Sequence, residues 1–129
     1  MNGRYLLDTN IVIALFADES AVTDRLREAE EIFVPSIVLG ELYYGARKSS
    51  RVEENVAQLD DFAARNVVLG CDTETARHYG VVKNRLRQKG QSVPENDIWI
   101  AAIALQRDLT LVARDAHFRR VDGLRLEAW

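Results

Sequence analysis

Four acidic residues stand where a carboxylate needs an explanation. Asp8 directly follows a short apolar run, and Asp115 follows another one near the end of the chain. Asp97 opens an apolar stretch, and Glu41 stands within the apolar sequence VPSIVLGELYYGA. If this sequence is helical, Glu41 shares a face with apolar residues three, four and seven positions away. A carboxylate in such a neighbourhood is costly unless it is paired, hydrogen-bonded or bound to a metal.

One metal site would account for all four acids together. Carboxylates brought together without a cation repel one another, and some of them would have to bind protons. Oxygen-preferring Mg²⁺ or Mn²⁺ removes this repulsion, whereas the sequence has no cluster of Cys and His that suggests zinc. One or two such ions can activate a water and stabilise the leaving oxygen in phosphodiester cleavage. The acids therefore indicate nuclease chemistry.

Each acid also has a simpler explanation. Asp8 can form an Asx-turn or cap the following helix. Asp97 occupies a favourable position at a helix N-terminus, and Asp115 can begin a turn. These explanations are independent of one another, whereas a metal site explains all four positions at once. We therefore prefer the metal site, with Asp8, Asp97 and Asp115 as direct ligands and Glu41 completing the site or positioning the attacking water.

The acids need a scaffold that brings distant segments together, and the hydrophobic pattern predicts one. Short apolar runs alternate with helical periodicity, which is typical of a parallel sheet covered by helices on both faces. The predicted strands are residues 5–7, 32–34, 67–69, 109–113 and, as a short edge strand, 124–126. The predicted helices are residues 9–17, 20–31, 34–46, 51–65, 72–90 and 97–107. Sites in such sheets form beyond the carboxyl ends of the strands, where Asp8 and Asp115 are expected.

The composition indicates one ordinary globular domain over residues 1–129. A chain of this length can bury most of its apolar surface without a disulfide or metal staple. The single Cys71 cannot form an internal disulfide, so a cytoplasmic location is the simplest expectation. The apolar run IVIALFA lacks the flanking features of a targeting signal, and the longest run, IWIAAIAL, is too short to span a membrane.

The charge distribution bears on a nucleic-acid partner. The net charge of −3 argues at first against one, but setting aside the four acids as metal ligands leaves a remainder of +1. Basic residues also form three groups: Arg47, Lys48 and Arg51; Lys83, Arg85, Arg87 and Lys89; and Arg114, Arg119 and Arg120. Each group alone is most simply a solvated surface, whereas together, beside an acidic site, they could hold a phosphate backbone.

Four motifs resemble those of PIN-domain ribonucleases, specifically the VapC-type toxins of bacterial toxin–antitoxin pairs. They are LLDTNIVIAL, PSIVLGELYYGA, NDIWIAAIAL and LVARDAHF, in an order and spacing that cover nearly the whole chain. The resemblance implies a three-layer α/β/α fold with a central, mostly parallel sheet. It also implies Mg²⁺- or Mn²⁺-dependent cleavage of RNA such as tRNA or rRNA, a homodimer, and inhibition by a cognate antitoxin whose tail enters the active-site groove. The family's acidic residues carry over to Asp8, Glu41, Asp97 and Asp115.

Other residues bear on the details of this site. Many relatives have Thr or Ser at the position of Ala113, whereas Thr9 supplies a hydroxyl next to Asp8. A metal-activated water would leave a 5′-phosphate and a 3′-hydroxyl without help from histidine. We therefore expect His78 and His117 to be structural, with His117 in the turn after Asp115.

Two other functions fit parts of the pattern. An α/β phosphoryl-transfer enzyme would use Asp8 as its nucleophile. That class resembles a pattern with a second Asp two residues later, where this chain has Asn10. A non-catalytic protein-binding module would use the acids as caps and its apolar helices to pair with a partner. Leu39 and Tyr43 point away from Glu41, and we expect them to pack inside the domain instead of meeting a partner.

Overall fold

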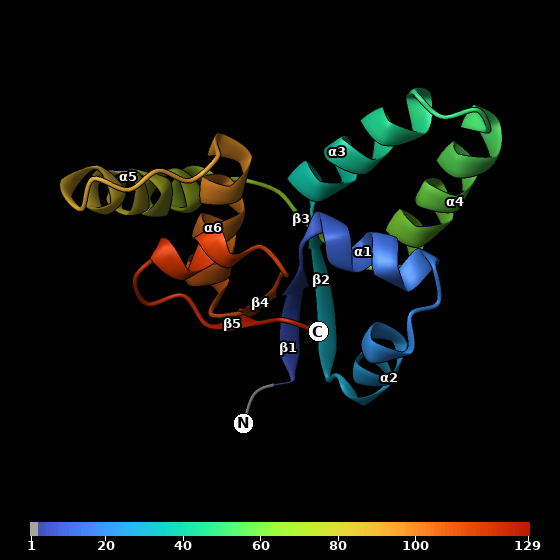
Figure 1. The fold of residues 1–129 in the computed structure, drawn as a ribbon, viewed down its shortest axis with the longest axis horizontal. Helices are drawn as coiled ribbons and strands as arrows, with labels where there is room; N and C mark the ends of the chain where they lie inside the picture. Colours follow the sequence, from blue (N-terminus) through green and yellow to red (C-terminus); the bar gives the residue numbers. More distant parts are fainter. Residues whose placement is uncertain (1–2) are drawn as a thin grey trace.

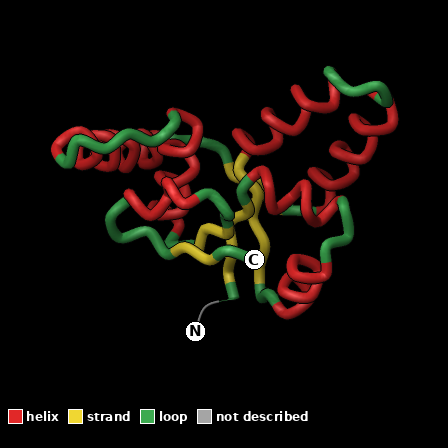
Figure 2. Tube along the Cα trace, in the orientation of Figure 1, coloured by secondary structure: helices red, strands yellow, loops and turns green. Residues whose placement is uncertain are grey.

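The computed structural model describes residues 3–129, and a five-stranded sheet lies at its centre (Figure 2). The strands are β1 (Arg4–Leu7), β2 (Glu31–Pro35), β3 (Val67–Leu69), β4 (Thr110–Val112) and β5 (Leu126–Glu127). They lie in the order β3-β2-β1-β4-β5, and every neighbouring pair is parallel. Each predicted strand is confirmed to within two residues, including the short strand at the edge.

Helices cover both faces of this sheet. Within residues 3–129 they are α1 (Thr9–Phe16), α2 (Ser20–Glu28), α3 (Ser36–Arg47), α4 (Val52–Arg65), α5 (Thr73–Gln88), α6 (Glu95–Arg107) and the 3₁₀ helix η1 (Ala116–Arg120). Helices α1 to α4 lie on one side of the sheet, and α5, α6 and η1 lie on the other (Figure 1). The predicted three-layer α/β/α architecture is confirmed.

Several helix boundaries differ from the sequence-based prediction by one to three residues, as in α3, which begins at Ser36 and not at residue 34. Helix α2 ends at Glu28, because Ala29 has an extended backbone with ψ of 142° that leads directly into β2. Helix α6 begins at Glu95, after Pro94, so Asp97 is its third residue and not its first. Asp97 therefore lies within the first turn, where its charge is still favourable for the helix dipole.

The strand order places a natural site beside β1. The chain runs from the central strand β1 outward to β2 and β3, and then crosses to β4 on the other side of β1. The crevice at such a reversal, beyond the carboxyl ends of the strands, is where open parallel sheets form their sites. Asp8 is the residue that directly follows β1.

The core explains the long apolar runs in the sequence. Leu6 and Leu7 of β1 and Leu111 of β4 are fully buried, as expected for parallel strands covered on both faces. In α6 every residue from Ile98 to Ala104 except Trp99 is buried, which accounts for the weak polar alternation of IWIAAIAL. No helix within the described residues is long and apolar enough to cross a membrane.

Helix α5 begins and ends as predicted from local sequence. Asp72 is its N-cap and accepts a hydrogen bond from the backbone N–H of Thr75 at 3.0 Å. The Thr75 hydroxyl in turn accepts one from the backbone N–H of Asp72 at 3.0 Å, which completes a capping box. Beyond the last turn, Gly90 has a φ of +67°, a conformation that favours glycine.

We expect the fold to depend on the buried hydroxyl of Thr75. Thr75→Val keeps the side-chain shape but removes the buried hydroxyl that accepts from the part-buried N–H of Asp72, so it should lower the free energy of unfolding by about 1–3 kcal/mol. Urea denaturation at pH 7 measures this change. Thr73→Val, at the exposed first residue of the same helix, is the matched control and should change stability by less than about 0.5 kcal/mol. Equal effects of the two substitutions would contradict this account of the cap.

Candidate active site

Asp8 is the most buried of the four predicted acids. Its backbone N–H donates to the Val112 carbonyl oxygen at 3.0 Å, which continues the β1–β4 hydrogen bonding by one residue. Only 6% of the residue is exposed. Although Asp8 precedes α1, its side chain makes no capping hydrogen bond to that helix. Helix capping therefore does not explain why a carboxylate is buried at this position.

The electrostatics around Asp8 show that the four acids belong to one group. Burial is the largest cause that raises the pKa of Asp8 to about 6, and the negative charges of Asp97, Glu41 and Asp115 raise it further. The backbone N–H of Thr9 acts in the opposite direction. Among the described residues, no basic side chain is among the groups that shift this pKa. The fold thus brings three further carboxylates close enough to Asp8 to oppose its ionisation.

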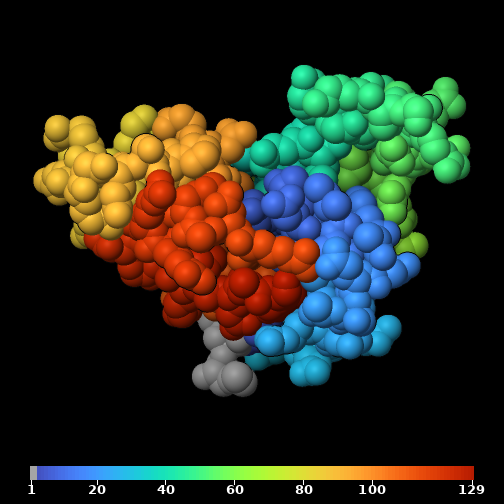
Figure 3. Space-filling model, in the orientation of Figure 1, coloured from blue at the N-terminus to red at the C-terminus, as the bar shows by residue number. Residues whose placement is uncertain are grey.

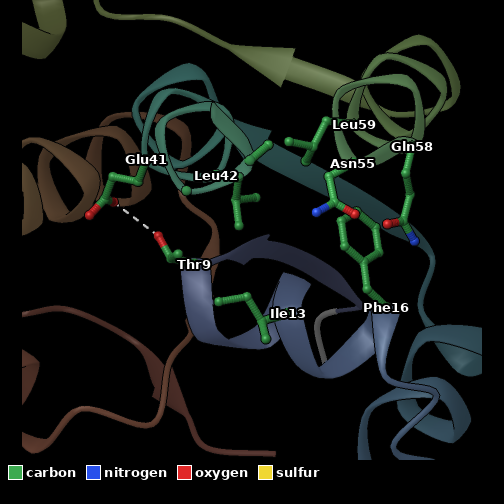
Figure 4. A pocket seen from close by; sticks show the side chains of 10 residues that line it. Thr9, Ile13, Phe16, Glu41, Leu42, Asn55, Gln58 and Leu59 are labelled. Carbon is green, nitrogen blue, oxygen red and sulfur yellow. Dashed lines mark hydrogen bonds between the residues drawn. The ribbon is translucent and has the colours of Figure 1, made fainter. Parts of the chain in front are cut away.

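Glu41 reaches this group from α3. The hydroxyl of Thr9 donates a hydrogen bond to Glu41 Oε1 at 2.9 Å (Figure 4). This bond links the start of α1 to the middle of α3. Glu41 itself is exposed, so the predicted apolar burial of this side chain is wrong. Helix α3 turns Val38 and Leu39 into the core and directs Glu41 to the crevice.

The side chains opposite Glu41 behave as predicted. Leu39 is buried in the main core, and Tyr43 packs against it. Tyr43 also donates a hydrogen bond to Asp60 Oδ1 of α4 at 2.5 Å. This contact holds α3 and α4 together as one arm of the molecule, which lies on the opposite side of the ribbon from α5 (Figure 1).

His117 lies between the other two acids. Its Nε2 is 2.6 Å from Asp97 Oδ2, and its Nδ1 is 2.7 Å from Asp115 Oδ1. Both ring nitrogens can donate hydrogen bonds at once only when the imidazole is protonated. Burial raises the pKa of Asp97, whereas the hydrogen bond and the charge of His117 lower it, and the charge of Asp115 raises it.

Asp115 also begins a turn, as its simpler explanation predicts. Its side chain accepts a hydrogen bond from the backbone N–H of His117 at 3.2 Å, and Asp115 is the N-cap of η1. The prediction that His117 lies in the turn after Asp115 is consistent with this placement. Sequence reasoning missed the contact of its ring with Asp97. The only local signal was the two-residue spacing in RDAHF, because Asp97 is 20 residues away.

The donor chemistry of the group fits a hard divalent cation, although the side chains do not form a finished metal site. No group of three or more His, Cys, Asp or Glu side chains in residues 3–129 has the arrangement of one. Asp97 and Asp115 each direct one oxygen at His117, and Glu41 directs one at Thr9. All four donors are carboxylates, and burial first and the three neighbouring carboxylates second raise the pKa of Asp8, so a hard divalent cation would favour its ionised form.

Most of the predicted basic groups are occupied in surface contacts. The ion pairs are Arg51 with Glu54, Lys83 with Glu95, Lys89 with Asp122, and Arg114 with Glu19. Lys48 instead lies over the ring of Tyr44, 4.4 Å from its centroid. Many of the predicted basic residues are therefore solvated side chains paired with acidic neighbours, and they do not form one open basic face.

A pocket of about 270 Å³ adjoins the acids between α1, α3 and α4. Thr9 and Glu41 form one end of it (Figure 4). Its remaining lining is mostly apolar: Ile13, Phe16, Leu42, Gly45, Ala46 and Leu59, with Asn55 and Gln58. In the space-filling view the surface is hollowed between α6 and the α3–α4 arm, with the beginning of α1 at the bottom (Figure 3).

This combination of fold and site agrees with known proteins. A family model described as "PIN domain" matches residues 5–124. The chain is 40% identical to "Ribonuclease VapC2" from Haemophilus influenzae, with 98% of each chain covered. It is 36% identical to "tRNA(fMet)-specific endonuclease VapC" from Shigella flexneri, again with 98% of each chain covered.

A solved structure extends the likeness to three dimensions. This chain superposes on a chain of the DNA-bound VapBC structure from Salmonella typhimurium with a TM-score of 0.91 and 34% sequence identity. The alignment covers 100% of this chain and 99% of the other. Sequence and fold thus agree with these proteins over nearly the full length. The chain therefore belongs to the PIN-domain family, as a member of its VapC-type ribonucleases.

Proposed function

We propose that the protein is a metal-dependent endoribonuclease and the toxin of a toxin–antitoxin pair. The observation that carries this proposal is the buried Asp8, whose pKa of about 6 reflects burial and three further carboxylates from separate segments. A divalent cation is the simplest group that makes this arrangement favourable. The names of the Haemophilus and Shigella relatives support RNA as the substrate.

The acids would divide the work as follows. Asp8, Asp97 and Asp115 would hold Mg²⁺ or Mn²⁺, which when bound supplies positive charge to the scissile phosphate and lowers the pKa of an attacking water. Thr9 holds Oε1 of Glu41, which leaves Oε2 to accept a proton from that water. The backbone bond of Asp8 to Val112 keeps its carboxylate fixed at the end of β1. Cleavage would leave a 5′-phosphate and a 3′-hydroxyl.

The substrate would be a structured cellular RNA such as tRNA or rRNA, met in the cytoplasm. The Shigella relative is named a tRNA(fMet)-specific endonuclease, which supports tRNA as the substrate class. Arg47, Arg85 and Arg119 have no ion pair within residues 3–129, so they are available to contact phosphates of a folded RNA. The competing phosphoryl-transfer function has no further support, since the structure offers Asn10 where that class has an acid.

The partner would be an antitoxin that docks beside the acids, and the likeness to a VapBC structure supports this. The pocket between α1, α3 and α4 offers apolar side chains next to Glu41, so a segment that fills it would also cover the entrance to the acids. Ile13 is 50% exposed and is the exposed residue among the large apolar side chains of this lining. A homodimer is part of the same proposal and stays a prediction.

Glu41→Gln should preserve the fold and reduce RNA cleavage by about 10²–10⁴-fold, because an amide cannot accept the proton of the attacking water. The measurement is cleavage of purified tRNA with Mg²⁺ or Mn²⁺, with circular dichroism as the check on folding. Glu53→Gln, on the exposed first turn of α4, is the matched control and should cleave at the normal rate. Cleavage by the wild type that persists in EDTA would contradict the proposed metal dependence. A wild type that cleaves with neither ion would favour a non-catalytic binding module.

The metal-free protein should become more stable when Asp8 is made neutral. The pKa of Asp8 is raised from 3.8 to about 6, so its ionised form costs the folded state about 3 kcal/mol above pH 6. This cost decreases as the pH falls through 6 and vanishes below 3.8, where both states bind the proton. In EDTA, Asp8→Asn should therefore raise the free energy of unfolding at pH 7 and change it little near pH 4. Urea denaturation at both pH values measures the difference, and a variant that is less stable at pH 7 would contradict it.

Ile13→Asp should weaken inhibition by the antitoxin while leaving RNA cleavage intact. The substitution places a charge in the apolar lining of the pocket, and a loss of about tenfold or more in affinity is expected. The measurement uses the product of the neighbouring open reading frame, titrated against RNA cleavage. Val81→Asp, at a similarly exposed apolar position on α5, is the control and should be inhibited normally. Equal inhibition of both variants would place the antitoxin elsewhere.

A further inference from the structure

The His117 side chain bridges two acids from different elements. Asp97 belongs to the first turn of α6, whereas Asp115 follows β4. The imidazole makes a short contact with one oxygen of each, at 2.6 Å and 2.7 Å. The His117 side chain is 16% exposed and that of Asp97 is 18% exposed, so water competes little for their contact, whereas the Asp115 side chain is 49% exposed.

The position of the ring is fixed by its own backbone. The backbone N–H of His117 donates to Asp115 Oδ1, which joins the two residues in one tight turn. The next residue, Phe118, is 1% exposed and anchors η1 in the core. The rings of His117 and Phe118 also lie 4.9 Å apart, centroid to centroid. The imidazole is therefore held by the backbone bond of its own residue and by the buried side chain next to it, and not only by the two carboxylates.

The bridge uses only half of each carboxylate. His117 occupies Oδ2 of Asp97 and Oδ1 of Asp115. Within the described residues, Asp97 Oδ1 and Asp115 Oδ2 have no hydrogen-bond partner. Both carboxylates also act on the charge of Asp8, so they lie near one another at the end of β1. Each of the two acids thus keeps one carboxylate oxygen that His117 does not contact and that could bind an ion.

We propose that His117 is a positioning residue, which holds Asp97 and Asp115 so that their free oxygens meet one divalent cation. This inference rests on the proposed metal-dependent function and adds a residue that the four acids alone do not include. Groups that hydrogen-bond to metal-binding side chains orient them, and their loss typically weakens metal affinity about 10–100-fold. His117 contacts neither the ion nor the RNA in this role, because both of its ring nitrogens face carboxylates.

Direct Mn²⁺ binding tests this role without relying on catalysis. Free Mn²⁺ is measured by electron paramagnetic resonance during titration of the wild type, His117→Ala and His117→Gln. We expect the dissociation constant of His117→Ala to rise about 10–100-fold. His117→Gln, whose amide can still donate one hydrogen bond, should lie between the two. His78→Ala removes the other histidine of the chain, on α5, and should bind Mn²⁺ as the wild type does.

Cleavage at increasing Mn²⁺ adds a second readout. The rate of His117→Ala should recover at saturating Mn²⁺, whereas Asp97→Asn, which lacks a ligand, should not recover. Thermal unfolding in EDTA shows whether each variant is folded, and a folded His117→Gln keeps the test decisive if the alanine variant unfolds. Unchanged or tighter Mn²⁺ binding by the folded variants would overturn the inference for His117 alone. A wild type that binds no Mn²⁺ would overturn the proposed metal dependence together with this inference.

Discussion

The arrangement of this molecule depends on one constraint, a carboxylate that must be held away from water at the end of the central strand. Asp8 can stay there because β1 is hydrogen-bonded on both sides, to β2 and β4, and because its own N–H continues the bonding to Val112. Burial and neighbouring negative charge both oppose its ionisation. The apolar core beneath it, from Leu6 and Leu7 to Leu111, supplies the stability that keeps this unfavourable group in place.

The other acids are placed by elements that approach this point from both sides of the sheet. Helix α3 brings Glu41 from one side, and α6 with the turn before η1 brings Asp97 and Asp115 from the other. Each of these three carboxylates has a polar partner, which is Thr9 for Glu41 and His117 for the two aspartates. The partners restrict side chains that would otherwise separate by repulsion, so the concentration of negative charge is retained in the folded protein.

A local role and a functional role are not exclusive in this site. Asp115 caps η1, as general turn chemistry predicts, and its carboxylate still acts on the charge of Asp8. Asp97 lies in the first turn of α6, where the dipole favours it, and it contacts His117 as well. Asp8 is different, since it stands before a helix without capping it. Asp8 is therefore the strongest argument for a shared metal site. The local helix and turn roles of Asp97 and Asp115 are compatible with that site.

The sequence by itself determined the features that depend on neighbouring residues. Apolar periodicity located the strands and helices, and Asp72 and Gly90 marked the ends of α5, because caps and turns are formed within a few residues. The four acids were recognisable because each departs from an apolar surrounding or follows a strand. Only the tertiary structure decided that Glu41 is exposed and held by Thr9, and that His117 bridges Asp97 and Asp115. These contacts join residues 32 and 20 positions apart, and their geometry follows from how the helices pack on the sheet, which no local pattern records.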